Sequence, residues 1–398
     1  MDKASFFIAR KLRHKGRVVT AAVAISFLVV IIAVAVSGGF RHEIRRGISE
    51  MTGDVQLTKS DMNYLDESSP VSTDQTYLPA VEQVEGVSEV QPVIYRAGIV
   101  KQSDEIYGVM LKGVDGGVRS ISGSEIPDSV ALAVAVPSTL ADVAGLKIGD
   151  RLLTYFVGEK TKVRQFNVVE IYEPLVRTDS RHLIYADIQD MQRLNGWSAD
   201  QASMFEITLS EDIIDENSML AVSDQIFEVV YDNKSEEDEL LLPVSAVERF
   251  SQIFEWVALI DFNVVFVLIL MIAVAGVNMI TGLLIMLFEN ISTIGLLKSL
   301  GMRNASIINV FMSRAAATVL KGMLIGNLVA FALCFIQSTT HLIHLDPANY
   351  FVSYVPIHLD VTTVIFADFI AFVSIMILLI LPSLFVLRVD PSKTIKMD

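Results

Sequence analysis

Histidine and cysteine are the side chains that most often supply acid, base, nucleophile or metal chemistry, and both are scarce in these 398 residues. His42 and His182 are far apart, and no His-Glu-x-x-His or Gly-x-Ser-x-Gly motif occurs. His341 and His344 fit one helical face, either as a metal-binding pair or as an interfacial pair without a functional role. The single cysteine, Cys334, excludes an intrachain disulfide framework and a multi-cysteine metal site. The sequence therefore predicts no catalytic residue, no bound cofactor and no metal site.

Nucleotide and nucleic-acid binding are also disfavoured. The chain lacks Gly-x-x-x-x-Gly-Lys-Ser/Thr and contains no Gly-Lys dipeptide, so it has no Walker A loop to surround the phosphates of ATP. A formal net charge of -15 repels a polyanion, which argues against a nucleic-acid partner. The acidic run at residues 236–239 is either a solvated loop or a cation site.

The chain contains four long apolar segments. Only 19% of the residues are charged, and mean hydropathy is +0.50. A helix needs about 20 apolar residues to cross a hydrocarbon layer roughly 30 Å thick. We predict spans at residues 18–38, 259–288, 315–337 and 361–387. The alternative for the first segment is a cleaved signal peptide ending near Ala33-Val34-Ala35, but its apolar run is longer than a typical signal core.

The short polar segments predict the orientation of these spans. Residues 1–17 carry a net charge of +5, residues 289–314 +2 and residues 388–398 +1, whereas residues 338–360 carry -2. Positive short segments stay in the cytoplasm, so both termini and the second connection are predicted inside, and residues 39–258 outside. Residues 41–258 contain 18 Lys and Arg against 38 Asp and Glu, a net charge of -20.

The outer segment has the pattern of a large α+β domain. We predict strands at residues 54–58, 90–95, 151–156 and 165–171, a hairpin turn at 158–161, and helices at 138–144, 187–194 and 218–230. Helical stalks are expected at residues 41–51 and 244–258, next to the first two spans. The fold class is thus an α-helical membrane protein with four transmembrane helices and a large α+β domain inserted between the first two.

The membrane segments contain three features of interest. Gly322, Gly326 and Ala330 recur at four-residue intervals, which predicts close packing of the third span on another helix. Lys321 and Asp368 are membrane charges; because they are predicted about 10 Å apart in depth, we expect no direct pair, and Lys321 either extends to the interface or takes part in transport.

Residues 289–301 predict a short cytoplasmic helix ending at Gly301. Its apolar residues fall at helical spacing, which predicts an amphipathic helix with one apolar face: Ile291, Ile294, Leu297 and Leu300. Physical chemistry leaves two roles open, a helix on the membrane surface or a docking element for a partner. The N-terminal segment at residues 6–12 is similarly amphipathic.

Several stretches together resemble the FtsX-like and MacB-like (type VII) ABC transporter permeases, most of all the LolC/LolE lipoprotein-releasing branch. They include Phe7-Ile-Ala-Arg-Lys-Leu-Arg13, Gly38-Gly-Phe-Arg-His-Glu-Ile44, Thr52-Gly-Asp-Val-Gln-Leu57, Leu111-Lys-Gly-Val-Asp115 and Gly145-Leu-Lys-Ile-Gly-Asp150. The helix at residues 289–301 is similar to the Glu-x-x-x-x-Ile-Gly-Ile-Leu-Lys-x-Leu-Gly pattern of that family. The resemblance implies a MacB-like periplasmic core domain and an FtsX-like permease domain at residues 259–398.

The resemblance also implies partners. A separate, LolD-like cytoplasmic ATPase would hold ATP and Mg and would dock on the coupling helix. The docking residues it implies are Glu289, Ile294, Gly295, Leu297, Lys298, Leu300 and Gly301. Thr293 stands where relatives often have an acidic residue. A second permease, copy or paralogue, would complete a dimer in the bacterial inner membrane.

The expected activity is extraction of lipoproteins from the inner membrane for sorting to the outer membrane. A family hook that captures a periplasmic carrier would lie at residues 157–162, where this chain has only a short turn, so carrier capture is not expected. The alternatives are mechanotransmission that drives a cell-wall hydrolase or an exporter, and an ATP-independent sensor or scaffold.

Overall fold

The computed structural model describes residues 17–60, 69–102, 105–117, 130–158, 161–176, 182–213 and 215–384. These residues form two compact units. The helical unit comprises residues 1–40, 257–344 and 354–398, and the sheet domain comprises residues 41–256 and 345–353. The predicted segment at residues 6–12 and the tail at 388–398 lie outside the described residues.

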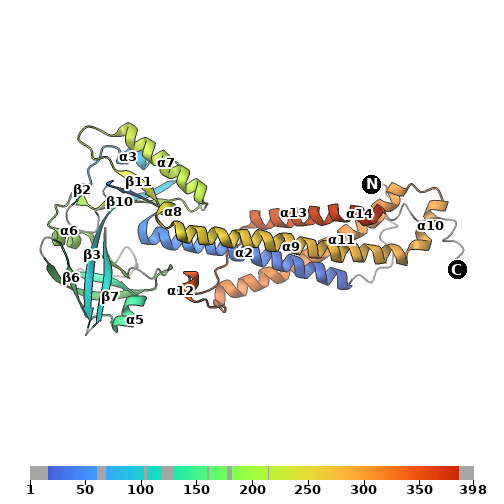
Figure 1. Cartoon of the computed structure of the whole chain (residues 1–398), viewed down its shortest axis with the longest axis horizontal. Helices are drawn as coiled ribbons and strands as arrows, with labels where there is room; N and C mark the ends of the chain where they lie inside the picture. The colour runs from blue at the N-terminus through green and yellow to red at the C-terminus, as the bar shows by residue number, and fades with distance from the viewer. Residues whose placement is uncertain are drawn as a thin grey trace. The chain divides into compact units, whose positions relative to one another are not determined.

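Four long apolar helices cross the helical unit. They are α2 (Arg17–Thr52), α9 (Ser251–Glu289), α11 (Asn304–Thr340) and α13 (Val361–Leu378), the last followed by α14 (Ile380–Ser383). Each contains an 18-residue window with a mean hydropathy of at least 2.1, so each is long and apolar enough to span a bilayer. Within this unit they run alongside one another (Figure 1). The predicted four spans are confirmed, and the predicted stalk at residues 41–51 is the continuation of α2.

The predicted stripe of small residues packs on α2. Gly322, Gly326 and Ala330 are all buried on α11. A methyl group built on Gly326 would lie 2.4 Å from the carbonyl oxygen of Ala24, and one on Gly322 would lie 2.7 Å from Val23. Only small side chains allow two helix backbones to approach this closely. The predicted close contact is therefore present, and its partner is the first span.

The sheet domain is built around nine strands. Their order is β11-β1-β10-β3-β4-β8-β5-β7-β6, and β3 also pairs with β6. The strands are β1 (Val55–Thr58), β3 (Val87–Gln102), β4 (Glu105–Val114), β5 (Ala133–Pro137), β6 (Arg151–Phe156), β7 (Lys162–Tyr172), β8 (His182–Asp187), β10 (Met204–Leu209) and β11 (Leu242–Ser245). The β3–β6 pairing closes six strands into a barrel, and a separate pair is formed by β2 (Val71–Ser72) and β9 (Gln201–Ala202).

Two cores stabilise this domain. The barrel is filled by residues that alternate inward along its strands, such as Val100, Leu111, Phe156 and Phe166, together with side chains of α5 (Ser138–Ala144) and α6 (Ile188–Asn195). Outside the barrel, α7 (Glu216–Asn233) and α8 (Ala246–Arg249) pack on β11, and α3 (Leu78–Val81) packs on α7 and β3 (Figure 1). The predicted strands, and the helices at residues 138–144, 187–194 and 218–230, are confirmed in type and position.

The connection between α11 and α13 differs from the prediction of a simple loop. Nine of its residues, 345–353, belong to the sheet domain and include α12 (Pro347–Tyr350). Trp256, at the beginning of α9, contacts the rings of Tyr350 and Phe351 edge-on, with centroids 6.2 and 5.4 Å away. The predicted stalk at residues 244–258 is likewise only partly helical, because Val244 and Ser245 pair in β11 before α8 begins.

The contact of α11 with α2 generates the first prediction. Gly326→Ala places a methyl group against a backbone carbonyl that cannot move independently, so we expect a loss of about 1–3 kcal/mol of stability from overpacking. The measurement is unfolding of the purified chain in detergent. The matched control is Gly108→Ala, because a methyl group there meets nothing within 4 Å. Equal stability of the two variants would contradict the packing shown by the structure.

Candidate functional site

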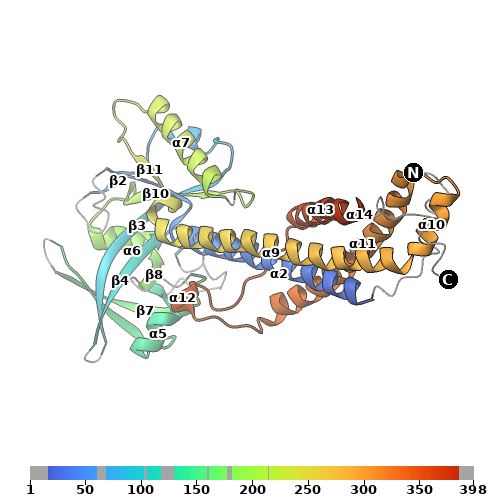
Figure 2. The same ribbon diagram turned by 45° about the vertical axis from the view of Figure 1, so that its right-hand side comes forward.

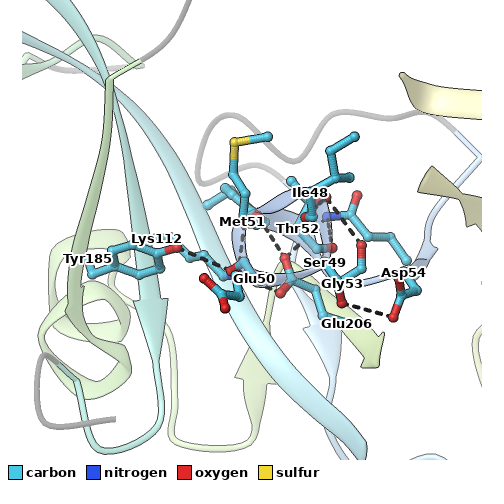
Figure 3. A network of polar contacts seen from close by, with 12 residues as sticks. Ile48, Ser49, Glu50, Met51, Thr52, Gly53, Asp54, Lys112, Tyr185 and Glu206 are labelled. Carbon is cyan, nitrogen blue, oxygen red and sulfur yellow. Dashed lines mark hydrogen bonds and ion pairs between the residues drawn. The ribbon is translucent and has the colours of Figure 1, made fainter. Parts of the chain in front are cut away.

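A row of polar side chains crosses one face of the sheet at the point where α2 ends. Tyr95, Lys112 and Tyr185 are directly paired positions on β3, β4 and β8, so their side chains lie side by side on one face. Glu206 and Gln56 are paired in the same way on β10 and β1. We call these five residues the helix anchor, and Figure 3 shows three of them against the last turn of α2.

The helix anchor binds the backbone carbonyls that the end of α2 leaves without helical partners. The Lys112 ammonium donates to Met51 O at 3.0 Å, and the Gln56 amide donates to Thr52 O at 2.9 Å. The Tyr185 hydroxyl donates to Glu50 O at 3.2 Å. A helix exposes its last carbonyls and a partial negative charge, so amide, hydroxyl and ammonium donors are suitable partners. The sheet therefore caps α2 with its own side chains (Figure 3).

Glu206 connects the donors of the helix anchor to one another. Its carboxylate accepts from Lys112 at 2.6 Å, from the Tyr95 hydroxyl at 2.6 Å and from Gln56 at 3.2 Å. The Lys112 and Glu206 side chains are only 2% and 1% exposed, respectively. A buried ion pair is costly to desolvate and is tolerated only when both charges have close partners. This requirement fixes the position of α2 on the sheet.

Two tyrosines surround the buried ammonium. Nζ of Lys112 lies 5.9 Å from the ring centroid of Tyr95 and 5.7 Å from that of Tyr185, within cation–π range. Burial raises the pKa of Tyr95 well above its ordinary value, and the Glu206 carboxylate raises it further. The pKa of Tyr185 is raised first by burial and then by the charges of Glu206 and Glu50. Both phenols therefore stay protonated and remain hydrogen-bond donors.

A second buried pair fixes the same helix two turns earlier. Arg45 on α2 contacts Asp54 at 3.1 Å and also donates to the carbonyls of Leu209 and Ser210. Asp54 accepts from the Ser49 hydroxyl at 2.9 Å and from the Leu209 amide at 2.8 Å. The last turns of α2 are thus held by the strand that follows the helix and by β10.

The beginning of α9 is attached to the same strand ladder. β1, which follows α2, pairs antiparallel with β11, which precedes α8 and α9, from Val55 opposite Ser245. The amide of Ala246 donates to Asp54 O at 2.8 Å. Ser245 and Glu248 form a capping box at the start of α8. Two membrane-crossing helices are therefore joined to adjacent strands.

The short helix predicted at residues 289–301 is α10 (Ile291–Ser299). The backbone amides of Gly301 and Met302 donate to the carbonyls of Lys298 and Leu297, and Gly301 has φ +82°. This is a Schellman ending, in which the left-handed residue is glycine because it has no Cβ. The predicted helix and its glycine cap are confirmed.

The residues proposed for docking on α10 do not share one face. Ile294 and Gly295 are buried against the helical unit, and Leu297 packs on the same core. Leu300 is 75% exposed, Gly301 and Glu289 are exposed, and Lys298 is half-buried. Leu296, which the sequence analysis omitted, is 56% exposed. The predicted single face was wrong because steps of three residues fall short of the 3.6-residue turn, so Leu300 points roughly 180° away from Ile291.

The other residues that the sequence singled out belong neither to the helix anchor nor to α10. Asp368 accepts from the Asn327 amide at 2.5 Å, and Lys321 is exposed. His341 lies against the ring of Tyr354, with centroids 4.0 Å apart. In the acidic run, Asp238 accepts from backbone amides of the domain and Glu239 contacts Lys59 at 3.2 Å. Within the described ranges, no three His, Cys, Asp or Glu side chains are arranged to hold a metal ion.

Sequence reasoning missed the helix anchor. Lys112 and Glu206 are 94 residues apart, and nothing in the sequence alone pairs them. The available signal was a single charge within an otherwise apolar stretch, as at residues 109–114 and 204–209, since such a charge is buried only when it is paired. Asp54, Gln56 and Lys112 do fall within stretches that support the family resemblance.

Comparisons with known proteins match this chain to a permease family model and to two curated relatives. Residues 265–391 match a family model described as FtsX-like permease C-terminal. The lipoprotein-releasing system transmembrane protein LolC of Neisseria meningitidis serogroup B (strain ATCC BAA-335 / MC58) is 23% identical over 376 residues, covering 85% of this chain and 84% of the relative. LolC of Xylella fastidiosa (strain 9a5c) is 20% identical over 402 residues, covering 94% and 92%.

Solved structures with a likeness to this chain include one periplasmic region and one extracellular domain. The periplasmic region of MacB from Actinobacillus actinomycetemcomitans gives a TM-score of 0.32 at 10% identity, covering 53% of this chain and 95% of that one. The extracellular domain of the noncanonic ABC-type transporter YknZ from Gram-positive bacteria gives 0.29 at 12% identity, covering 48% and 98%.

The helix anchor generates the second prediction. Glu206→Gln leaves the Lys112 ammonium buried without its counter-charge, so we expect a loss of about 3–5 kcal/mol of stability. The double variant Lys112→Met, Glu206→Gln should recover part of that loss, because no isolated charge remains. Denaturant unfolding of the full chain in detergent measures both variants.

The control for this prediction lies on the same helix. Arg46 and Glu50 form a pair at 3.0 Å whose side chains are 60% and 53% exposed, so Arg46→Gln should cost less than about 1 kcal/mol. If Glu206→Gln were as mild as Arg46→Gln, the anchor would not hold α2.

Proposed function

Because this chain belongs to the FtsX-like, LolC-like permeases of ABC transporters, we propose that it couples ATP hydrolysis by a separate cytoplasmic subunit to the extraction of lipoproteins from the inner membrane. The observation that carries the proposal is the fixation of α2 and α9 on adjacent strands of one outer domain. The names of the LolC relatives support lipoproteins as the cargo.

The proposed topology follows the charge of the connections. Both termini and α10 lie in the cytoplasm, since their segments are basic, and the sheet domain, whose residues 41–256 carry a net charge of -20, lies in the periplasm. α2 and α9 continue without a break from the helical unit into the sheet domain. A displacement of α10 by the ATPase would therefore be transmitted along α9 to β11 and, through the helix anchor, shared with α2.

The energetic demand of the proposed reaction explains why an ATPase is needed. Each acyl CH₂ transferred out of the bilayer costs about 0.8 kcal/mol, and a lipoprotein anchor contains dozens of them. No side chain of this permease has to perform covalent chemistry for such work. Its task is to form a path with a second permease, copy or paralogue, and to move rigid helices.

This chain gives less information about a periplasmic carrier that would receive the lipoprotein. Phe156 at the end of β6 pairs with Lys162 at the start of β7, so only five residues separate the strands at the position where relatives would have a carrier-binding hook. A carrier hook would have to come from the second permease. The competing function is mechanotransmission to a cell-wall hydrolase or an exporter, which would use the same helix attachment without lipoprotein cargo.

The exposed residues of α10 generate the third prediction. Leu296→Asp and Leu300→Asp place charges where an apolar ATPase surface would bind, so we expect at least a tenfold loss of ATPase copurification with the permease. Ser292→Asp is the control, because it adds the same charge at an exposed position near the start of the helix. Unchanged association of the leucine variants would favour an ATP-independent sensor or scaffold.

The cargo is tested by depletion of the protein in cells. We expect lipoproteins destined for the outer membrane to accumulate in the inner membrane, measured by membrane fractionation, and to copurify with the permease. Rescue by the wild-type chain and failure of rescue by Leu300→Asp would tie the effect to ATPase docking. Normal lipoprotein sorting after depletion would reject lipoprotein release and leave mechanotransmission as the function.

A further inference from the structure

Helix α7 has one face in the core of the sheet domain. Met219, Val222, Ile226 and Val230 are buried, and the helix packs on α3, β11 and α8 at the flank of the domain (Figure 2). This spacing is that of an amphipathic helix, whose opposite face is normally polar. Asp215 accepts from the Ser218 amide and caps its beginning. The helix thus packs on the domain through this face, and the opposite face carries exposed side chains.

The outer face of α7 carries two large aromatic side chains. Phe227 and Tyr231 are 41% and 67% exposed, one helical turn apart, with their rings stacked at 6.3 Å and an interplanar angle of 29°. Single exposed apolar residues are ordinary on protein surfaces, whereas adjoining aromatics form a patch. Exposed aromatic rings are also the side chains that most often supply binding energy at protein interfaces.

Acidic residues surround this aromatic pair. Asp224, Glu228 and Asp232 are exposed on the same helix, and residues 216–233 contain no Lys or Arg. The exposed Glu236 and Glu237 follow just beyond the end of α7. The face therefore combines two apolar anchors with a strongly negative rim.

Charge decides which partner fits such a surface. An anionic lipid headgroup or a nucleic acid would be repelled. A second copy of this face would bring like charges together, which is costly at an interface. A basic protein segment would instead meet opposite charges around the two rings.

We propose that the face of α7 formed by Asp224, Phe227, Glu228, Tyr231 and Asp232 is a docking surface for a basic, amphipathic protein segment. The partner would cover the two rings with apolar side chains and place Lys or Arg opposite the acidic rim. α7 belongs to the sheet domain and contributes no residue to the helix anchor or to α10, so this proposal does not rest on the proposed function.

The test uses the full chain in nanodiscs of neutral lipid and three fluorescent 15-residue helical peptides. The peptides share Leu at positions i, i+3, i+4 and i+7 and carry Lys, Gln or Glu at the polar positions. We expect the Lys peptide to bind most tightly, after subtraction of its binding to empty nanodiscs, and to weaken as salt is raised. Equal binding of the Glu peptide would overturn the proposal.

Variants locate the binding on α7. Phe227→Ser with Tyr231→Ser should weaken the Lys peptide at least tenfold, and Asp224→Asn with Glu228→Gln and Asp232→Asn should flatten its salt dependence. The matched control is Val143→Ser with Ile148→Ser, which removes apolar side chains 57% and 66% exposed elsewhere on the domain. Unchanged thermal unfolding would show that the α7 variants fold. Peptide affinity unaffected by the α7 variants, or equally reduced by the control, would contradict a site on this face.

Discussion

The buried pair of Lys112 and Glu206 is the interaction on which the rest of the structure depends. A charged pair that is about 2% exposed is stable only if every donor and acceptor finds a partner, and here the partners include the last carbonyls of α2. A shift of the helix end would remove the Lys112 ammonium from the carbonyl of Met51. An apolar contact would permit sliding, whereas this hydrogen bond favours one position. The end of α2, residues 41–52, is consequently fixed on the sheet of its own unit.

The topology of the sheet extends that rigidity to a second helix. β1 and β11 are adjacent in the ladder, so the segments that follow α2 and precede α9 are hydrogen-bonded to each other. At its other end α9 leads directly into α10, whose Leu296 and Leu300 are exposed while Ile294 is held in the helical unit. α9 therefore runs from the strand ladder of the sheet domain to α10. The proposed transmission of motion rests on this connection.

Much of this organisation could be predicted from the sequence because its signals are local. The four spans follow from uninterrupted apolar runs, and the ending of α10 follows from Gly301. The helix anchor could not be predicted, because Tyr95, Lys112, Tyr185 and Glu206 come from four strands whose register only the folded sheet defines. The prediction of a single apolar face on α10 was wrong because a nine-residue helix with four large apolar residues, followed by Leu300, offers two apolar faces. The inclusion of residues 345–353 in the outer domain depends on ring contacts with Trp256, which leave no pattern in the sequence.

The central claim is that residues 41–52 of α2 and the sheet of the same unit move as one body during the ATPase cycle. Its most direct test is a spin-label distance between Arg46→Cys on α2 and Lys101→Cys on β3, both exposed, in a Cys334→Ser background of the assembled transporter. The distance distribution should be the same without nucleotide and in the vanadate-trapped state, and it should broaden when Glu206→Gln removes the counter-charge of Lys112. A distance that changes between the two nucleotide states of the otherwise unaltered protein would contradict a rigid anchor.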